Sequence, residues 1–220
     1  ALALCDGSAA EVLSWGCGSD GQLGHGTCES EAYPRPISKL GGLHAVVVAC
    51  GGRHSLVATR AGVAFSFGEG SCGQLGSGTV TVGQAVPSEM RRDAAPSLLA
   101  TPSLIGTRDG MAVVGATRSL AAGGCHSLLI DEVGSVRACG AGGDGRLGTG
   151  LDANELRPVA LTSLQGIVIA RAAAGAAHSA FLSACGRLFT CGLNTSGQLG
   201  LGDRTARYWP TLVQPTALGY

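Results

Sequence analysis

The sequence predicts an all-β fold made of repeated propeller blades, and three observations support this prediction. Glycine supplies 37 of the 220 residues, yet hydrophobic residues still reach 45%, a combination that favours short strands joined by tight turns. A glycine-rich segment occurs four times with the same internal spacing. The repeat period is close to 50 residues, with about four strand candidates in each unit, which is typical of a propeller blade.

The four glycine-rich segments align without gaps. Within each, glycine recurs 5, 8 and 10 residues after the first glycine, and leucine follows it by 7. Glycine adopts positive φ at little cost, so we expect a left-handed turn at these positions. Offset 2 is glycine in three segments and Asn194 in the fourth, which predicts a left-handed residue there too. The repeat positions are Gly16, Gly21, Leu23, Gly24, Gly26; Gly68, Gly73, Leu75, Gly76, Gly78; Gly140, Gly145, Leu147, Gly148, Gly150; and Gly192, Gly197, Leu199, Gly200, Gly202.

A second element carries one histidine in each of three repeats: His54, His126 and His178. Each histidine precedes the next segment's first glycine by 14 residues, and another glycine stands six residues before that end. This pattern predicts a strand, a tight turn and a second strand, which together make an antiparallel hairpin. Each histidine is followed by serine, which suggests a local hydrogen-bonding role at the start of a strand.

The repeat length varies in one place only. Successive first glycines are 52, 72 and 52 residues apart, so the second repeat carries a 20-residue insertion, which we place at about 79–110. Two further strand candidates complete each unit, one after a proline and one before the histidine. The repeat units of this single domain, 1–220, are expected at 12–62, 63–134, 135–186 and 187–220, the last of them truncated.

The combination W-G-x-G-x-x-G-Q-L-G-x-G with G-G-x-H-S-L resembles the regulator of chromosome condensation repeat over nearly the whole chain. This resemblance implies a seven-bladed ring of four-stranded sheets, with blades shared between neighbouring repeats. Seven units would need roughly 360 residues. We therefore expect a partial ring, cut from a longer protein: three complete four-stranded blades and partial blades at both ends. Leu2–Gly7 matches the strand and turn after the histidine, and Pro210–Val213 is expected to open a new blade.

Composition excludes several classes of function. The 15 basic and 15 acidic residues balance and form no basic face of the kind that binds nucleic acid. The nine cysteines include no C-x-x-C pair for zinc, and we interpret them as small buried residues in a reducing compartment. No apolar stretch approaches the ~20 residues of a membrane span, and no signal peptide is evident. We expect an intracellular protein, cytoplasmic or nuclear and not secreted.

Motifs that suggest chemistry have structural explanations. The segment from Gly16 matches the dinucleotide fingerprint G-x-G-x-x-G, but the residues that follow it would not form the required helix. No acidic residue is placed consistently to orient the repeated histidines as metal ligands. Each histidine and its adjacent serine would point to opposite faces of a strand, so they form no catalytic pair. We expect no catalytic residue, no metal and no cofactor.

The leading functional hypothesis is a protein–protein interaction scaffold without enzymatic activity. The resemblance also implies two alternatives, a guanine-nucleotide exchange factor for a Ran-like small GTPase and a targeting domain of a larger enzyme such as a ubiquitin ligase. Ultraviolet-sensing plant relatives carry tryptophan in a G-W-R-H element, where this chain has Gly52, Gly124 and Ala176; this difference argues against light sensing. The insertion, with Arg91, Arg92 and Asp93, is the candidate partner loop. Deleting 82–100 is expected to spare folding and weaken partner capture.

Overall fold

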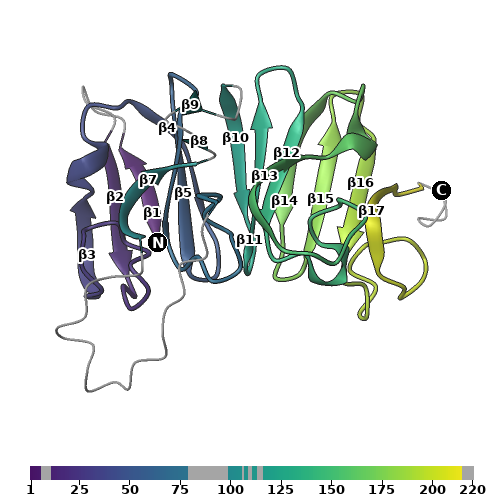
Figure 1. The fold of residues 1–220 in the computed structure, drawn as a ribbon, viewed down its shortest axis with the longest axis horizontal. Helices are drawn as coiled ribbons and strands as arrows, with labels where there is room; N and C mark the ends of the chain where they lie inside the picture. The colour runs from purple at the N-terminus through teal and green to yellow at the C-terminus, as the bar shows by residue number, and fades with distance from the viewer. Residues whose placement is uncertain (6–10, 79–98, 106, 109–110, 113–115, 215–220) are drawn as a thin grey trace.

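The computed structural model describes residues 1–5, 11–78, 99–105, 107–108, 111–112 and 116–214. Four antiparallel sheets follow one another in chain order, as Figure 1 shows, and a two-stranded ribbon is the fifth sheet of the described chain. The helical segments of the same residues are three-residue 3-10 turns. None of them is a long apolar helix that could cross a membrane.

Each sheet is a run of strands paired in sequence order. Sheet 1 contains β1 (Leu2–Cys5), β2 (Glu11–Gly16) and β3 (Glu31–Pro36); sheet 2 contains β4 (Ala45–Cys50), β5 (His54–Thr59), β6 (Ala64–Gly68) and β7 (Leu99–Leu104); sheet 3 contains β10 (Thr117–Ala122), β11 (His126–Asp131), β12 (Val136–Gly140) and β13 (Glu155–Ala160); sheet 4 contains β14 (Ile169–Ala174), β15 (His178–Ser183), β16 (Leu188–Gly192) and β17 (Arg207–Leu212). The ribbon contains β8 (Thr107–Arg108) and β9 (Met111–Ala112), and the 3-10 turns are η1 (Ser38–Leu40), η2 (Gly143–Gly145) and η3 (Thr162–Leu164).

The hairpin predicted from the histidine spacing is present in sheets 2, 3 and 4. His54 pairs with Gly68, His126 with Gly140 and His178 with Gly192. Sheet and repeat are offset, since each complete sheet takes its first two strands from one repeat and its last two from the next. The blades are therefore shared between neighbouring repeats, as the resemblance implies.

The hydrophobic core lies between neighbouring sheets. One cluster joins Leu128, Ile130 and Val136 of sheet 3 with Ile169 and Phe181 of sheet 4. The four leucines at offset 7 of the glycine segments are all 1% exposed or less. Burial of one such side chain contributes roughly 1.5–3 kcal/mol, and Leu147 belongs to the cluster that joins sheets 3 and 4.

The two ends of the described chain differ. Sheet 1 has three strands, and β1 pairs with β2 as the match of Leu2–Gly7 to the post-histidine strand predicts. The prediction for Pro210–Val213 was wrong. These residues belong largely to β17, which returns antiparallel to β16 and completes sheet 4, with Gly192 opposite Arg207. The glycine loop between them acts as a hairpin connection, so the strand after it joins the preceding blade.

The insertion is divided between two connections. Four residues lie between each of Gly26, Gly150 and Gly202 and the next strand, but 20 lie between Gly78 and β7. The remaining four extra residues lie between β7 and β10, where the ribbon forms. The predicted range 79–110 therefore includes β7, an ordered strand paired with β6. Arg91, Arg92 and Asp93 lie outside the described residues.

Candidate functional site

One end of the sheets gathers most of the repeated residues. We call it the glycine-loop face, defined by the loops 17–30, 69–78, 141–154 and 193–206 and by the short loops 51–53, 123–125 and 175–177. The register explains why they meet, since each histidine that begins a strand lies opposite the glycine that ends the next one. This face is at the bottom of Figure 1. The insertion at 79–98 connects β6 to β7 at the same end.

The repeat glycines shape these loops through their backbone. All sixteen glycines at offsets 0, 5, 8 and 10 have positive φ, between 65° and 113°. Such values are costly for residues with a Cβ. The four loops on the glycine-loop face therefore share the same four left-handed glycine positions.

Offset 2 has a different reason for its glycine, and the predicted left-handed residue there was wrong. Gly142 has a φ of −91°. A Cβ at Gly18 or Gly142 would instead clash with the carbonyl oxygen of Glu29 or Ala153, where the loop returns. Steric crowding, not backbone handedness, selects glycine at this position.

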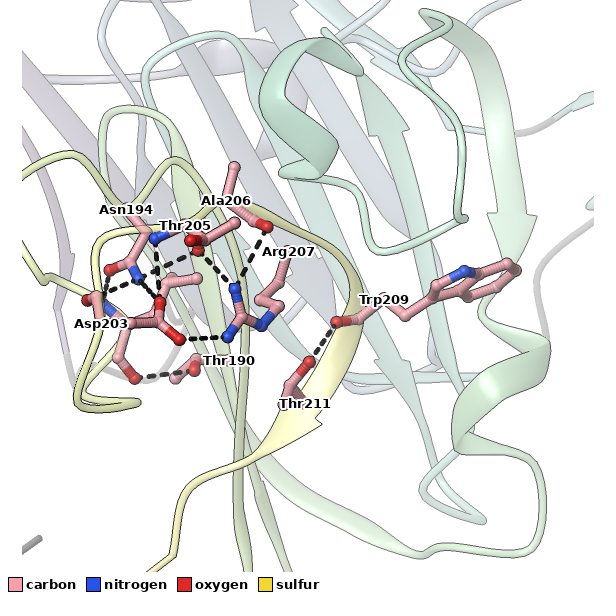
Figure 2. A network of polar contacts seen from close by, with 9 residues as sticks. Thr190, Asn194, Asp203, Thr205, Ala206, Arg207, Trp209 and Thr211 are labelled. Carbon is pink, nitrogen blue, oxygen red and sulfur yellow. Dashed lines mark hydrogen bonds and ion pairs between the residues drawn. The ribbon is translucent and has the colours of Figure 1, made fainter.

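Asn194 occupies offset 2 in the fourth loop through a hydrogen-bond network, which Figure 2 shows. Its Nδ2 donates to the carbonyl oxygens of Asp203 and Thr205 at 3.0 and 3.1 Å, and its Oδ1 accepts the N–H of Leu199 at 3.0 Å. The Thr205 N–H and the Arg207 guanidinium both bind the Asp203 carboxylate and hold the pKa of that group below its usual value. At offset 2 the fourth loop therefore has a side chain that hydrogen-bonds to the returning chain, whereas Gly18 and Gly142 have no room for a side chain.

Histidine–serine hydrogen bonds join one sheet to the next. His54 Nε2 lies 2.9 Å from Ser127 Oγ, and His126 Nε2 lies 2.9 Å from Ser179 Oγ. Each of these serines donates its only hydroxyl proton to a loop carbonyl, Ser127 to Gln74 at 2.7 Å and Ser179 to Arg146 at 2.6 Å. The histidine Nε2–H must therefore be the donor to the serine oxygen, which assigns the tautomer.

The two linked histidines are neutral at physiological pH. Burial lowers the pKa of His54 to about 4 and that of His126 to about 3, with nearby Arg146 adding to the second shift. Their Nδ1 atoms are buried without a hydrogen-bond partner. The predicted local role was wrong, because the partner serine lies 73 or 53 residues away in the next sheet. In the sequence, the repeated His-Ser pair was the one sign of these hydrogen bonds between sheets.

Backbone contacts close the same boundaries. The Gly52 N–H donates to Gly123 O at 3.0 Å, and the Gly124 N–H donates to Gly175 O at 3.2 Å. A Cβ at Gly52 or Gly124 would lie 2.8 or 2.5 Å from a carbonyl oxygen of the next sheet. At Gly52 and Gly124 the backbones of adjacent sheets therefore approach too closely for a side chain.

The third loop replaces the glutamine of the repeat with Arg146. In the other loops the glutamine Oε1 accepts a backbone N–H within the loop, as Gln74 does from Cys72 at 2.9 Å. Arg146 instead donates to Gly143 O at 2.8 Å and reaches Ala176 O of sheet 4 at 3.5 Å. Arg146 thus keeps a hydrogen bond inside its own loop and adds a contact to the neighbouring sheet.

The cysteines are more exposed than predicted. Cys139 and Cys191 are buried, and burial raises the pKa of each to about 12. Five others are exposed, and Cys72 and Cys125 are half-buried. In the part of the chain that the structure describes, no three histidine, cysteine or acidic side chains are arranged to hold a metal ion.

Comparison with protein families gives a match along most of the chain. The model of the regulator of chromosome condensation (RCC1) repeat matches residues 10–58, 134–182 and 185–217. A second model of the same repeat matches 45–74 and 169–198. The first set alone covers more than half of the residues.

Individual relatives match nearly the whole chain but not their own full length. The chain is 35% identical to the ultraviolet-B receptor UVR8 of Arabidopsis thaliana over 93% of its residues and 42% of that protein. It is 31% identical to the probable E3 ubiquitin-protein ligase HERC6 of Homo sapiens, over 97% of the chain and 19% of the ligase.

Solved structures give the same picture. Human WBSCR16 superposes with a TM-score of 0.76 and 28% identity, over 97% of this chain and 50% of that one. Yeast RCC1 (Prp20), solved in complex with Kap60, superposes with a TM-score of 0.74 and 25% identity, over 94% of this chain and 45% of that one. The chain thus spans half or less of each of these relatives.

Proposed function

Because this chain belongs to the regulator of chromosome condensation (RCC1) repeat family, we propose that it is a protein–protein interaction scaffold that binds a partner through its glycine-loop face. The observation that carries the proposal is the gathering of four glycine loops at one end of the sheets, the end where β6 stops and β7 starts. Loops on a rigid scaffold commonly carry recognition. A yeast member of the family, RCC1 (Prp20), was solved bound to the protein Kap60, which supports a protein as the partner.

The proposed binding role needs no catalytic group. The buried histidines are held neutral and bonded to serine between the sheets, where they stabilise the packing of blades. The charged side chains of the face that solvent reaches have both signs, with Arg53 exposed and Glu69 and Asp144 half-buried. A protein surface of mixed charge suits this face better than nucleic acid does, and we place the protein inside the cell.

A deletion tests the scaffold role. Removing 82–97 leaves four residues between Gly78 and β7, the same number as in the other three loops. The previously expected deletion of 82–100 would also remove the first two residues of β7 and is therefore less suitable. We expect the shorter deletion to keep the melting temperature within a few degrees and to weaken capture of partners from cell extract, measured by quantitative mass spectrometry.

A matched control lies on the opposite end of the sheets. Val133 is 73% exposed in the β11–β12 turn, and Val133→Ser changes the surface without touching the glycine-loop face. This variant is expected to capture partners as the unchanged protein does. Undiminished capture by the deletion variant would make the insertion a passive loop, and loss of folding would make it structural.

Two other roles have specific support. The structure of Prp20p from Saccharomyces cerevisiae was described together with its binding to Gsp1p and histones. This similarity favours a role as a guanine-nucleotide exchange factor for a Ran-like GTPase. The similarity to several HERC ubiquitin ligases favours a targeting domain in a larger enzyme. If the purified protein accelerates nucleotide release from a Ran-like GTPase, the exchange-factor role replaces the scaffold role. A ligase domain in the same gene product would favour the second.

A further inference from the structure

Two half-buried cysteines lie on neighbouring segments at the boundary between sheets 2 and 3. Cys72 lies in the glycine loop after β6, and Cys125 directly precedes β11. The loop of Cys72 and the strand after Cys125 are in direct contact, because Ser127 Oγ, two residues after Cys125, donates at 2.7 Å to the carbonyl oxygen of Gln74, two residues after Cys72. Burial raises the pKa of Cys125, and the nearby Cys72 adds to this shift. They are 53 residues apart in sequence, so the tertiary structure alone brings them together.

The equivalent positions at the neighbouring boundary show that this is a point of contact between sheets. Asp20 has the place of Cys72 in the first loop, and Arg53 has the place of Cys125 before β5. Arg53 NH1 lies 4.0 Å from Asp20 Oδ1. At the boundary between sheets 3 and 4 the corresponding residues are Asp144 and Ala177. A pair of thiols therefore replaces an ion pair at one of the three boundaries between the described sheets.

The raised pKa of Cys125 disfavours its thiolate, so Cys72 is the thiol expected to attack first. Both cysteines are partly accessible to solvent, and the charges of Glu69 and Arg146 act on Cys125 with opposite signs. Ser71 Oγ donates to Cys72 Sγ at 3.9 Å, and the Cys72 N–H is fixed by Gln74 Oε1 at 2.9 Å. By contrast, the buried Cys139 and Cys191 are enclosed in the core.

We propose that Cys72 and Cys125 are a redox modification site and form a reversible disulfide that joins sheets 2 and 3. The oxidant is a small-molecule disulfide such as oxidised glutathione. The Cys72 thiolate attacks one of its sulfurs, which gives a mixed disulfide and one glutathione thiolate. The Cys125 thiolate then attacks Cys72 Sγ and releases the second glutathione. Two protein thiols are oxidised, one disulfide is reduced, and the two thiol protons end on two glutathione molecules.

The bridge has a physical consequence for the domain. It closes a loop that contains β7 and the whole insertion, and cross-links of long loops restrict the unfolded chain most. Oxidation is therefore expected to raise Tm by about 5–10 °C for a domain of this size. It also joins sheet 2 to sheet 3 covalently.

Peptide mapping of the full chain tests the proposal. The purified protein is equilibrated in glutathione buffers from reducing to oxidising, free thiols are alkylated, and the protein is digested with trypsin. Cys72 is the only cysteine of peptide 61–91, and Cys125 is the only cysteine of peptide 119–137. We expect these two peptides to become the predominant disulfide-linked pair, within a monomeric band on a non-reducing gel.

Matched variants decide the outcome. Cys72→Ser and Cys125→Ser are each expected to lose the linked pair and the rise in Tm, while Cys50→Ser, at an exposed cysteine elsewhere, keeps both. Near-ultraviolet circular dichroism of the reduced proteins verifies that each variant folds. Glutathione attached to Cys28 and Cys50 without a 61–91/119–137 link would overturn the proposal. Linkage spread evenly over all exposed cysteines would overturn it as well.

Discussion

At the scale of single residues, Gly148 combines two requirements that can be separated. Its φ is 74°, and a Cβ would lie 3.0 Å from Pro210 Cδ in the outermost strand of the next sheet. Gly202 has nearly the same φ, 80°, but open space around it. Gly148 therefore carries both backbone strain and a steric limit, whereas Gly202 carries the strain alone.

Valine substitutions measure the two contributions. We expect Gly76→Val and Gly148→Val to lower the free energy of unfolding by at least about 1–3 kcal/mol, because a β-branched residue meets both positive φ and a packed neighbour. Gly202→Val is expected to cost less, roughly 1 kcal/mol from strain alone. Urea unfolding followed by circular dichroism gives the three values. An unchanged Tm in the first two variants would contradict the assignment of strained backbone.

The buried histidines predict a specific dependence on pH. The pKa of His54 and His126 is about 4 and about 3 in the folded protein, against about 6.5 in the unfolded chain. Below pH 6.5 the unfolded state binds protons that the folded state does not. The free energy of unfolding therefore falls as pH decreases from 6.5 toward 4, by up to roughly 1.4 kcal/mol per pH unit for each histidine.

Urea titrations between pH 7 and pH 5 check this slope. The double variant His54→Asn with His126→Asn is expected to be less stable at pH 7 but to depend less on pH. His44→Asn, at a histidine in the exposed loop before β4, serves as the control and is expected to keep the full slope. An identical slope in the double variant would mean that other groups cause the acid sensitivity.

At the scale of elements, the second residues of β5 and β11, Ser55 and Ser127, differ in one hydrogen-bond partner. Ser127 donates to Gln74 O and accepts from His54, whereas Ser55 donates to Gln22 O and has no histidine partner among the described residues. Replacing Ser127 leaves the His54 Nε2–H buried without an acceptor, which costs about 1–3 kcal/mol. Replacing Ser55 removes one bond only.

We therefore expect Ser127→Ala to destabilise the protein more than Ser55→Ala, by about the cost of one orphaned donor, and Ser179→Ala to behave like Ser127→Ala. Ser135→Ala, at an exposed turn, is expected to change stability by less than about 0.5 kcal/mol. Chemical denaturation of the four variants provides the comparison. Equal losses at Ser55 and Ser127 would show that the histidine link adds no stability between sheets.

At the scale of the whole molecule, the described sheets leave surfaces at both ends of the row. The edge of β1 away from β2 has no paired strand among the described residues, and on sheet 4 Leu182 and Leu188 are 39% and 38% exposed. Unpaired strand edges and exposed apolar side chains promote pairing between chains. We expect the isolated 220-residue chain to self-associate. Light scattering coupled to size exclusion tests this, and a monodisperse monomer that melts cooperatively at high concentration would count against it.

The sequence alone determined the positions of the turns and of the histidine hairpins. Positive φ is a local requirement, so the glycines at offsets 0, 5, 8 and 10 mark the loops wherever they occur. Repetition then made the all-β architecture predictable, because several copies of one pattern must share one structure. The length of the insertion followed from counting residues between equivalent glycines.

Only the tertiary structure decided which residues meet across the boundaries between sheets. It placed β17 in sheet 4, gave His54 a serine 73 residues away, and brought the loop of Cys72 against the strand that follows Cys125. It also showed that Gly18 and Gly142 avoid a clash with a returning carbonyl group. These contacts depend on how one sheet stacks on the next, and that geometry is set by the packing of all the blades together rather than by the residues near any one position in the chain.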